Sequence, residues 1–405
     1  MPKQRIPDDH DVAETRYLNR IGLLGEGFFS RLSIGIIAFA LPLYARQIGL
    51  SMAEIGVLVS FNLGISMVLK PFSGWVADRV GYKRSAWMAT ALRSLLYVLL
   101  AGAALPWQLL SLQGARGAVK AVRDPALYTL IAVHGGKKRL ASTFSWYMTA
   151  KGSAGSIGRA LSGVLITLTA SNYGWVFGIA AGLSLVSLIF LSFVESKGAE
   201  EIEPTCQTNA DHHPRHWVSI VPYLGFGFLT TATARLIRGL MPLIMVEYSG
   251  LSAAQAGILY VIATLVMLVC TPIFGWLYDH VNRKVVLMAR GMANMVSSIL
   301  YLVAPTFVGF AIAKAFDKAG TAAFQPAWGA LMAEVSGQSQ HRRAQHMGLM
   351  STGENAGAFA APMIGGLCWS IGGVAALMGL RIALAIISEV YSYMLFRSRN
   401  RSHSA

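Results

Sequence analysis

Charged residues are scarce in this chain, and acidic residues are scarcer than basic ones. Only 13% of the 405 residues are charged, whereas a soluble globular chain carries about 25%. Apolar residues make up 54%, and the mean hydropathy is +0.52. Such a chain cannot cover its surface with side chains that suit water. We therefore expect an integral, multi-pass membrane protein.

Cysteine is also scarce, and the sequence lacks the patterns of the common catalytic sites. Cys206, Cys270 and Cys368 are far apart and show no metal-ligand spacing, so we interpret them as ordinary residues of a reducing or membrane environment. No Walker pattern and no Ser/His/Asp or nucleotide-binding constellation is present. We expect no enzyme, no direct use of ATP and no cofactor. The first twenty residues hold no apolar signal-peptide core, so we expect no cleavage there.

The apolar runs set the expected number of membrane spans. A transmembrane helix needs about 20 residues, so 405 residues accommodate about twelve spans with short loops. We expect the first six near residues 21–44, 53–77, 86–105, 107–133, 140–170 and 175–194. The second six are expected near residues 218–248, 254–278, 286–304, 307–335, 344–370 and 373–396.

One long polar stretch, residues 195–216, divides these spans into two halves and is typical of a solvated linker. Its Asp211, His212, His213 and His216 could hold a metal, but a linker with a few histidines more often binds nothing, so we assign no metal site. We expect an all-α membrane protein with a tail at 1–20, a six-helix bundle at 21–194, the linker, a second bundle at 217–396 and a tail at 397–405.

The net charge of +15 is concentrated in alternate connections between the expected spans. These basic residues are Arg79, Lys83, Arg84, Lys137, Lys138, Arg139, Arg283, Lys284, Arg342, Arg343, Arg397, Arg399 and Arg401. The opposite connections contain only Arg46. Because positive residues collect in cytoplasmic loops, we expect both termini in the cytoplasm, in a bacterial cytoplasmic (inner) membrane. This also accounts for most of the excess charge without a nucleic-acid partner.

The chain contains an internal repeat with an offset of 201 residues. Residues 74–84, which we term the signature loop, return as residues 275–284. At the same offset Gly56 matches Gly257, and Pro125 matches Pro326. Transporter folds built from two like halves leave such symmetry in their sequences.

The signature loop reads G-x-x-x-D-R-x-G-x-K-R between two apolar runs, from Gly74, Asp78, Arg79, Gly81, Lys83 and Arg84. It resembles the loop between transmembrane helices 2 and 3 of the major facilitator superfamily, a family of secondary transporters. The resemblance covers nearly the whole chain at the level of fold. It implies two pseudo-symmetric six-helix bundles that rock about a central site.

The same resemblance implies a cytoplasmic gate. Asp78 would lie near the start of the eleventh helix, where the helix dipole favours an anion, while Arg79, Lys83 and Arg84 would add salt links. The second copy of the loop keeps Asp279 but has His280 and Asn282 where the first has Arg79 and Gly81. We therefore expect an asymmetric gate in which the first loop is the stronger.

The fourth expected span carries the densest charge. Arg116, Lys120 and Arg123, the cationic stripe, have i, i+4, i+7 spacing and share one helical face. Asp124 points about 100° away from Arg123, so we do not expect it to neutralise the stripe. A charge at mid-bilayer costs about 2.5 to 3.5 kcal/mol, so the stripe needs acids from another helix, water or an anionic ligand.

Residues 116–125, and the residues that follow Lys70, also resemble segments of one branch of the family. Arg116 lies where many members place an arginine tied to proton coupling. At the 201 offset Arg116 becomes Asp317, Arg123 becomes Phe324 and Lys70 becomes Thr271. Because the repeat keeps scaffold residues and changes these charges, we connect them with the transported species. The alternative is that Arg116 and Lys120 extend to the membrane interface.

Further charges lie in other expected spans. Glu26 and Arg31 are five residues apart in the first span, on different faces. Glu26 is the best acid to answer the stripe and could couple a proton, although a structural ion pair is equally consistent. Arg235 and Arg238 in the seventh span could add positive potential. Lys314, Asp317 and Lys318 can pair within their own helix and are interpreted as structural.

These observations predict a secondary active transporter that moves a small, anionic or acid-bearing solute, coupled to protons, as a monomer in the lipid bilayer. A proton-driven exporter of amphiphilic drugs is the alternative. The glycine-proline pattern that marks antiporters lacks its proline in the fifth span, at residues 155–163, which disfavours that reading. A member that no longer transports, and acts as a receptor or an assembly protein, is a further alternative.

Overall fold

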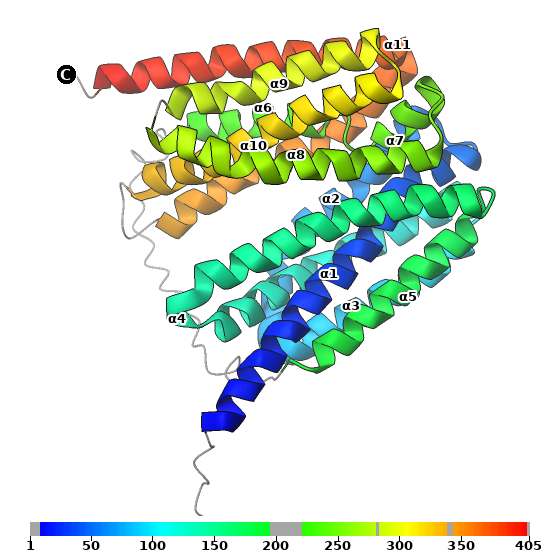
Figure 1. Cartoon of the computed structure of the whole chain (residues 1–405), viewed down its shortest axis with the longest axis vertical. Helices are drawn as coiled ribbons and strands as arrows, with labels where there is room; N and C mark the ends of the chain where they lie inside the picture. Colours follow the sequence, from blue (N-terminus) through cyan, green and yellow to red (C-terminus); the bar gives the residue numbers. More distant parts are fainter. Residues whose placement is uncertain (1–8, 195–220, 281–282, 338–342, 403–405) are drawn as a thin grey trace, which may run out of the picture. The chain divides into compact units, whose positions relative to one another are not determined.

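The computed structural model describes the chain except for residues 1–8, 195–220, 281–282, 338–342 and 403–405, and also leaves undescribed some side chains within helices (Figure 1). Its regular elements are helices. They are α1 (Asp9–Gln47), α2 (Met52–Val80), α3 (Tyr82–Ala101), α4 (Pro106–Leu168), α5 (Tyr173–Ser192), α6 (Val221–Arg235), α7 (Met241–Leu243), the π-helical turn η2 (Ile244–Tyr248), α8 (Ala253–His280), α9 (Arg283–Val303), α10 (Phe307–Gly337) and α11 (Arg343–Ser402).

Two of these elements, α4 and α11, each contain two helical arms. The 23 residues between Tyr128 and Lys151 would extend about 35 Å in a straight helix, yet Lys151 Nζ lies 3.2 Å from Tyr128 Oη. The chain must therefore reverse within α4. In α11 the break is at Gly372 and Gly373. The positive φ of 68° at Gly373 separates one arm from the next.

Counting these arms separately, and α6, α7 and η2 as one span, gives the twelve helices predicted from the sequence. Within the described ranges, five segments are long and apolar enough to cross a membrane. They are Ile21–Gln47, Met52–Lys70, Tyr173–Ser192, Ala253–Phe274 and Leu349–Leu395.

The helices form two compact units. Unit 1 contains Met1–Ala40 and Gly64–Gln207, and unit 2 contains Leu41–Leu63 and Thr208–Ala405. The predicted linker and its histidines lie outside the described residues. The end of α1 and the start of α2 therefore belong to unit 2, together with the second half of the sequence. A division of the chain at the linker would assign them to the first half.

In unit 1, glycines allow α1 and the second arm of α4 to approach closely. A Cβ built on Gly158 would meet the carbonyl oxygen of Leu32, and one on Gly35 would lie 2.5 Å from the carbonyl oxygen of Gly155. Backbone atoms cannot move aside as side chains do, so these positions require glycine. The two helices thus approach closely at Gly155 and Gly158, whereas a Cβ on Gly152 meets nothing within 4 Å.

The same packing recurs in unit 2. A Cβ on Gly353 would meet the carbonyl oxygen of Leu224, and one on Gly357 would lie 2.5 Å from that of Phe228. The first arm of α11 therefore packs on α6 as the second arm of α4 packs on α1. The repeat of the sequence is consequently also a repeat of helix packing.

The segment Leu41–Leu63 is held in unit 2 by direct contacts. Arg46 Nε lies 3.2 Å from Glu247 Oε1. The backbone N–H of Ala53 donates to Ser370 Oγ over 2.9 Å. A Cβ on Gly56 would lie 3.1 Å from Gly366 Cα, so α2 and α11 cross closely at this point.

Candidate functional site

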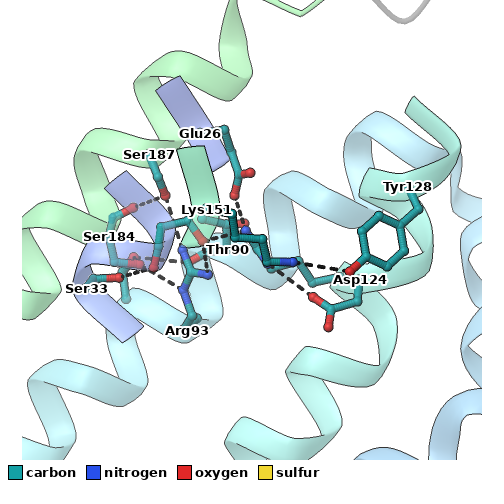
Figure 2. Close-up of polar contacts among 12 residues, drawn as sticks. Glu26, Ser33, Thr90, Arg93, Asp124, Tyr128, Lys151, Ser184 and Ser187 are labelled. Carbon is teal, nitrogen blue, oxygen red and sulfur yellow. Dashed lines mark hydrogen bonds and ion pairs between the residues drawn. The ribbon is translucent and has the colours of Figure 1, made fainter. Parts of the chain in front are cut away.

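The centre of the candidate site is a buried ion pair between α1 and the first arm of α4 (Figure 2). Arg123 Nη2 contacts Glu26 Oε1 and also donates to Ser30 Oγ over 2.5 Å. Arg123 is 3% exposed and Glu26 is 0% exposed. A buried charge without a partner is strongly unfavourable, which explains why the two side chains meet. The acid expected to answer the stripe is the one that contacts Arg123.

Asp124 also pairs with Arg123, with 3.2 Å between Nη1 and Oδ1. The prediction that Asp124 leaves the stripe uncompensated is therefore wrong. Neighbouring Cβ atoms do diverge around a helix, but an arginine side chain is long enough to turn its guanidinium back toward the next residue. Arg123 thus bridges two carboxylates, one on α1 and one on its own helix.

Lys151, on the second arm of α4, extends the site. Its ammonium donates to Tyr128 Oη over 3.2 Å and lies 5.2 Å from the centre of the Tyr128 ring and 5.4 Å from that of Tyr147. Figure 2 shows Lys151 and Tyr128 beside Asp124. Sequence reasoning missed Lys151, although a lysine within the expected fifth span was an available signal.

A second buried guanidinium adjoins the ion pair. Arg93 of α3 is 5% exposed and donates to Ser30 Oγ over 2.8 Å, to Ser184 Oγ over 3.1 Å and to Ser187 Oγ over 3.2 Å. Ser30 therefore accepts from both Arg93 and Arg123, and the two charges form one polar cluster (Figure 2). Sequence analysis missed Arg93 too, although a charge in the middle of the third span should have been considered.

Not every predicted residue faces this cluster. Arg116 contacts the side chain of Gln113, and its guanidinium lies 5.1 Å from the ring centre of Tyr97 on α3. The stripe therefore has different partners along its length, with α3 beside Arg116 and α1 beside Arg123. Lys120 is half-buried between them.

The remaining predicted cations are distributed over both units. In unit 1, Arg31 is half-buried, with its Cγ 3.3 Å from a Cβ built on Gly155, and Lys70 is exposed. In unit 2, Arg235 is half-buried and Arg238 is exposed. The structure thus brings Glu26, Arg123 and Asp124 together and adds Lys151 and Arg93 beside them.

Unit 2 contains its own buried charge network, built around Arg381. This arginine, which is 0% exposed, donates to Asn294 Oδ1 over 2.9 Å, to Ser297 Oγ over 3.1 Å and to Asp317 Oδ1 over 2.7 Å. Asp317, whose predicted pairing was within α10, therefore has an ion pair with the second arm of α11. Arg381 Nε also donates to the carbonyl oxygen of Thr233 over 3.3 Å, so the network connects α6, α9, α10 and α11, as an architectural cluster does.

The signature loop is described in part. Gly81 has a φ of 90° at the start of α3, and Lys83 Nζ donates to the carbonyl oxygen of Ser192 over 3.1 Å. Arg79 and Arg84 are exposed. Gly74 and the side chains of Asp78 and Asp279 lie outside the described part. Lys83 therefore connects the loop to the end of α5.

Metal ligands do not gather in the part of the chain that the structure describes. No group of three or more histidine, cysteine, aspartate or glutamate residues is found there that could hold an ion. The site consists instead of guanidinium, ammonium, carboxylate, hydroxyl and phenol groups. Such groups can bind anions and exchange protons.

Comparisons with known proteins show which family has this architecture. A family model described as Major Facilitator Superfamily matches residues 24–223 and 223–405. No curated protein matches the chain in a sequence comparison.

Several solved structures have the same fold. One is the nucleoside transporter NupG, with 14% identity, a TM-score of 0.72, and coverage of 93% of this chain and 98% of that one. Another is a bacterial homolog of the human lysosomal transporter Spinster, inward-facing and unoccupied, with 14% identity, a TM-score of 0.70, and coverage of 96% and 98%. The peptide transporter POT in complex with sulfate has 13% identity, a TM-score of 0.71, and coverage of 95% and 94%.

Proposed function

This chain belongs to the Major Facilitator Superfamily of secondary transporters, and we propose that it moves a small anionic or acid-bearing solute, coupled to protons. The observation that carries the proposal is the balance of charge in unit 1. Five cations surround Glu26 and Asp124 there, namely Arg31, Arg93, Lys120, Arg123 and Lys151. This excess of positive charge favours a negatively charged ligand.

The ion pair supplies a route to coupling. Glu26 relies on Arg123 for its charged state, because a carboxylate that is 0% exposed has no access to water. An anion that binds Arg123 competes with Glu26 for the same guanidinium. Glu26 then loses its counter-charge and takes up a proton, so the solute and the proton bind together.

Alternating access would carry the loaded site across the bilayer. The signature loop would hold the cytoplasmic gate, with Asp78, Arg79, Gly81, Lys83 and Arg84 in the roles that the family resemblance implies. The contact from Lys83 to the end of α5 supports a structural connection between the loop and the sixth span. The basic alternate connections support cytoplasmic termini in a bacterial inner membrane, and a monomer is sufficient for this cycle.

Uptake into proteoliposomes tests the proposal. The purified protein is reconstituted and challenged with labelled carboxylates, phosphate monoesters and organic cations, with and without an inward proton gradient. We expect an anion to accumulate when the gradient is imposed. Arg123→Gln should abolish this accumulation, and Glu26→Gln should uncouple it from the gradient while leaving exchange of the anion.

A matched control separates transport from folding. Arg381→Gln also removes a buried arginine from a carboxylate, but in unit 2, whereas the proposed site belongs to unit 1. If Arg123→Gln and Arg381→Gln fold equally well and only the first loses uptake, the site is supported. Cation flux that survives Arg123→Gln would contradict the proposal and favour a drug exporter. A well-folded protein that moves no solute would favour the non-transporting alternative.

A further inference from the structure

The internal repeat identifies the place in unit 2 that corresponds to the Glu26–Arg123 pair. At the 201 offset, Glu26 becomes Gly227 and Arg123 becomes Phe324. The ion pair is thus absent from the second copy, and a glycine and an aromatic ring replace it. Leu127, one turn after Arg123, becomes Trp328.

Three aromatic rings fill this place. The ring centres of Phe226 and Trp328 are 5.4 Å apart, those of Phe324 and Trp328 are 5.9 Å apart, and those of Phe226 and Phe324 are 6.1 Å apart. They come from α6 and α10, and Trp328 is 3% exposed. The three rings are buried against one another, and the electron density of an aromatic face attracts cations.

A carboxylate from α11 adjoins one of these rings, that of Trp328. A Cβ built on Gly227 lies 3.1 Å from Trp328 Cζ2 and 3.5 Å from Glu354 Cγ, so the two side chains occupy the space next to this glycine. Glu354 replaces Ser153 of the first copy. The second copy therefore has a negative charge from the eleventh span where the first copy has none.

The polar groups at this place retain bonding capacity. The buried indole N–H of Trp328 faces the Glu354 carboxylate as a hydrogen-bond donor, and a carboxylate has further lone pairs that can accept from a ligand. Arg235 on α6 is a positive charge close enough to influence the Glu354 carboxylate. Glu26 has a buried ion pair, whereas none of the ion pairs found among the described residues includes Glu354.

We propose that Glu354, with Trp328, Phe226 and Phe324, binds a protonated amine of the transported solute. A carboxylate next to aromatic faces suits an alkylammonium group, because the acid supplies the charge and the rings supply cation–π contacts. The inference rests on the proposed function, since it names a chemical group of the transported solute. The substrate class is then an organic molecule that bears an amine.

Three probes that share a phenyl ring separate the contributions. Phenylalanine carries both charges, 3-phenylpropionate only the acid, and 2-phenylethylammonium only the amine. Binding of each to the purified full chain is measured by calorimetry, and counterflow is measured in proteoliposomes. Glu354→Gln keeps the size of the side chain and removes its charge, and Glu389→Gln is the control, a half-buried acid on the other arm of α11.

We expect Glu354→Gln to weaken binding of both amine-bearing probes about tenfold to a hundredfold, the usual effect of losing one charge-assisted contact. Binding of 3-phenylpropionate should not change, and Glu389→Gln should bind all three probes as the wild type does. Trp328→Phe, which keeps a ring, should weaken amine binding less than Glu354→Gln.

Other results would overturn the inference. Equal amine binding by wild type and Glu354→Gln, or no amine binding by well-folded wild type, would do so. Loss of proton-driven accumulation with unchanged amine affinity would make Glu354 a proton carrier instead. The proposed function fails separately, if 3-phenylpropionate binds Arg123→Gln as tightly as wild type. A Glu354-dependent amine site that persists in that case would still support cation recognition.

Discussion

The two partners of the buried ion pair should differ in their contribution to stability. Removing one partner of a buried pair costs about 3–5 kcal/mol, mostly because the other charge is left without compensation. After Arg123→Gln, Glu26 is that charge, and its Oε2 atom already has no hydrogen bond among the described residues. We therefore expect Arg123→Gln to lower the free energy of unfolding by about 3–5 kcal/mol.

Glu26→Gln should cost less, because Arg123 keeps two partners. Its guanidinium still contacts Asp124 at 3.2 Å and Ser30 at 2.5 Å. The expected loss is about 1–3 kcal/mol, the range for one buried polar group that loses a partner. The double variant should lose less than the sum of the two single variants, because neither charge then remains unpaired.

Chemical unfolding of the purified protein in mixed micelles measures these differences. The comparison is internal, since all variants share the same helices and the same detergent. If Glu26→Gln destabilises the protein more than Arg123→Gln, or if the double variant shows a simple sum, then the bonding described for Arg123 does not control stability and this reasoning is refuted.

Three further perturbations test local features of the fold. Gly158→Ala should cost about 1–3 kcal/mol, because the new Cβ meets a backbone carbonyl of α1; thermal unfolding should show little change for Gly152→Ala, where nothing lies within 4 Å. Gly81→Ala should cost about 1–3 kcal/mol, because its φ of 90° strains any residue with a Cβ; an unchanged melting temperature would contradict this. Arg46→Ala and Glu247→Ala should each cost less than about 1 kcal/mol, since the pair is 44% and 34% exposed; a larger loss that persists in high salt would show that the pair is not solvent-screened.

Much of the fold could be predicted from sequence because its determinants are local. A hydrophobic run long enough to span a bilayer forms a helix, since its backbone groups have no water to bond. The twelve spans follow from this rule, including the two that meet near Gly372 and Gly373. The offset of 201 residues likewise predicted two like halves, and the glycine contacts in both units show the same packing.

The candidate site was predicted less completely, because its contacts join separate helices. Periodicity places Arg116 and Arg123 on one face, but it cannot tell that α3 adjoins one and α1 the other. It also predicted no contact between Arg123 and Asp124, because it treats side chains as fixed directions. Lys151 and Arg93 were passed over as single charges, and their importance depends on tyrosine and serine partners contributed by other helices or by the other arm of α4.

Composition, apolar runs and the repeat thus determined the membrane setting, the number of spans and the two halves, and the resemblance of the signature loop indicated the family, since each depends on residue type along the chain. Tertiary structure alone decided which charges meet. It paired Glu26 with Arg123 and directed Asp317 to Arg381. It also placed Glu354 next to Trp328 in the second half. The physical reason is that a buried charge is stabilised by whichever groups the packing of helices brings within a few ångströms, and that distance is not a property of sequence spacing.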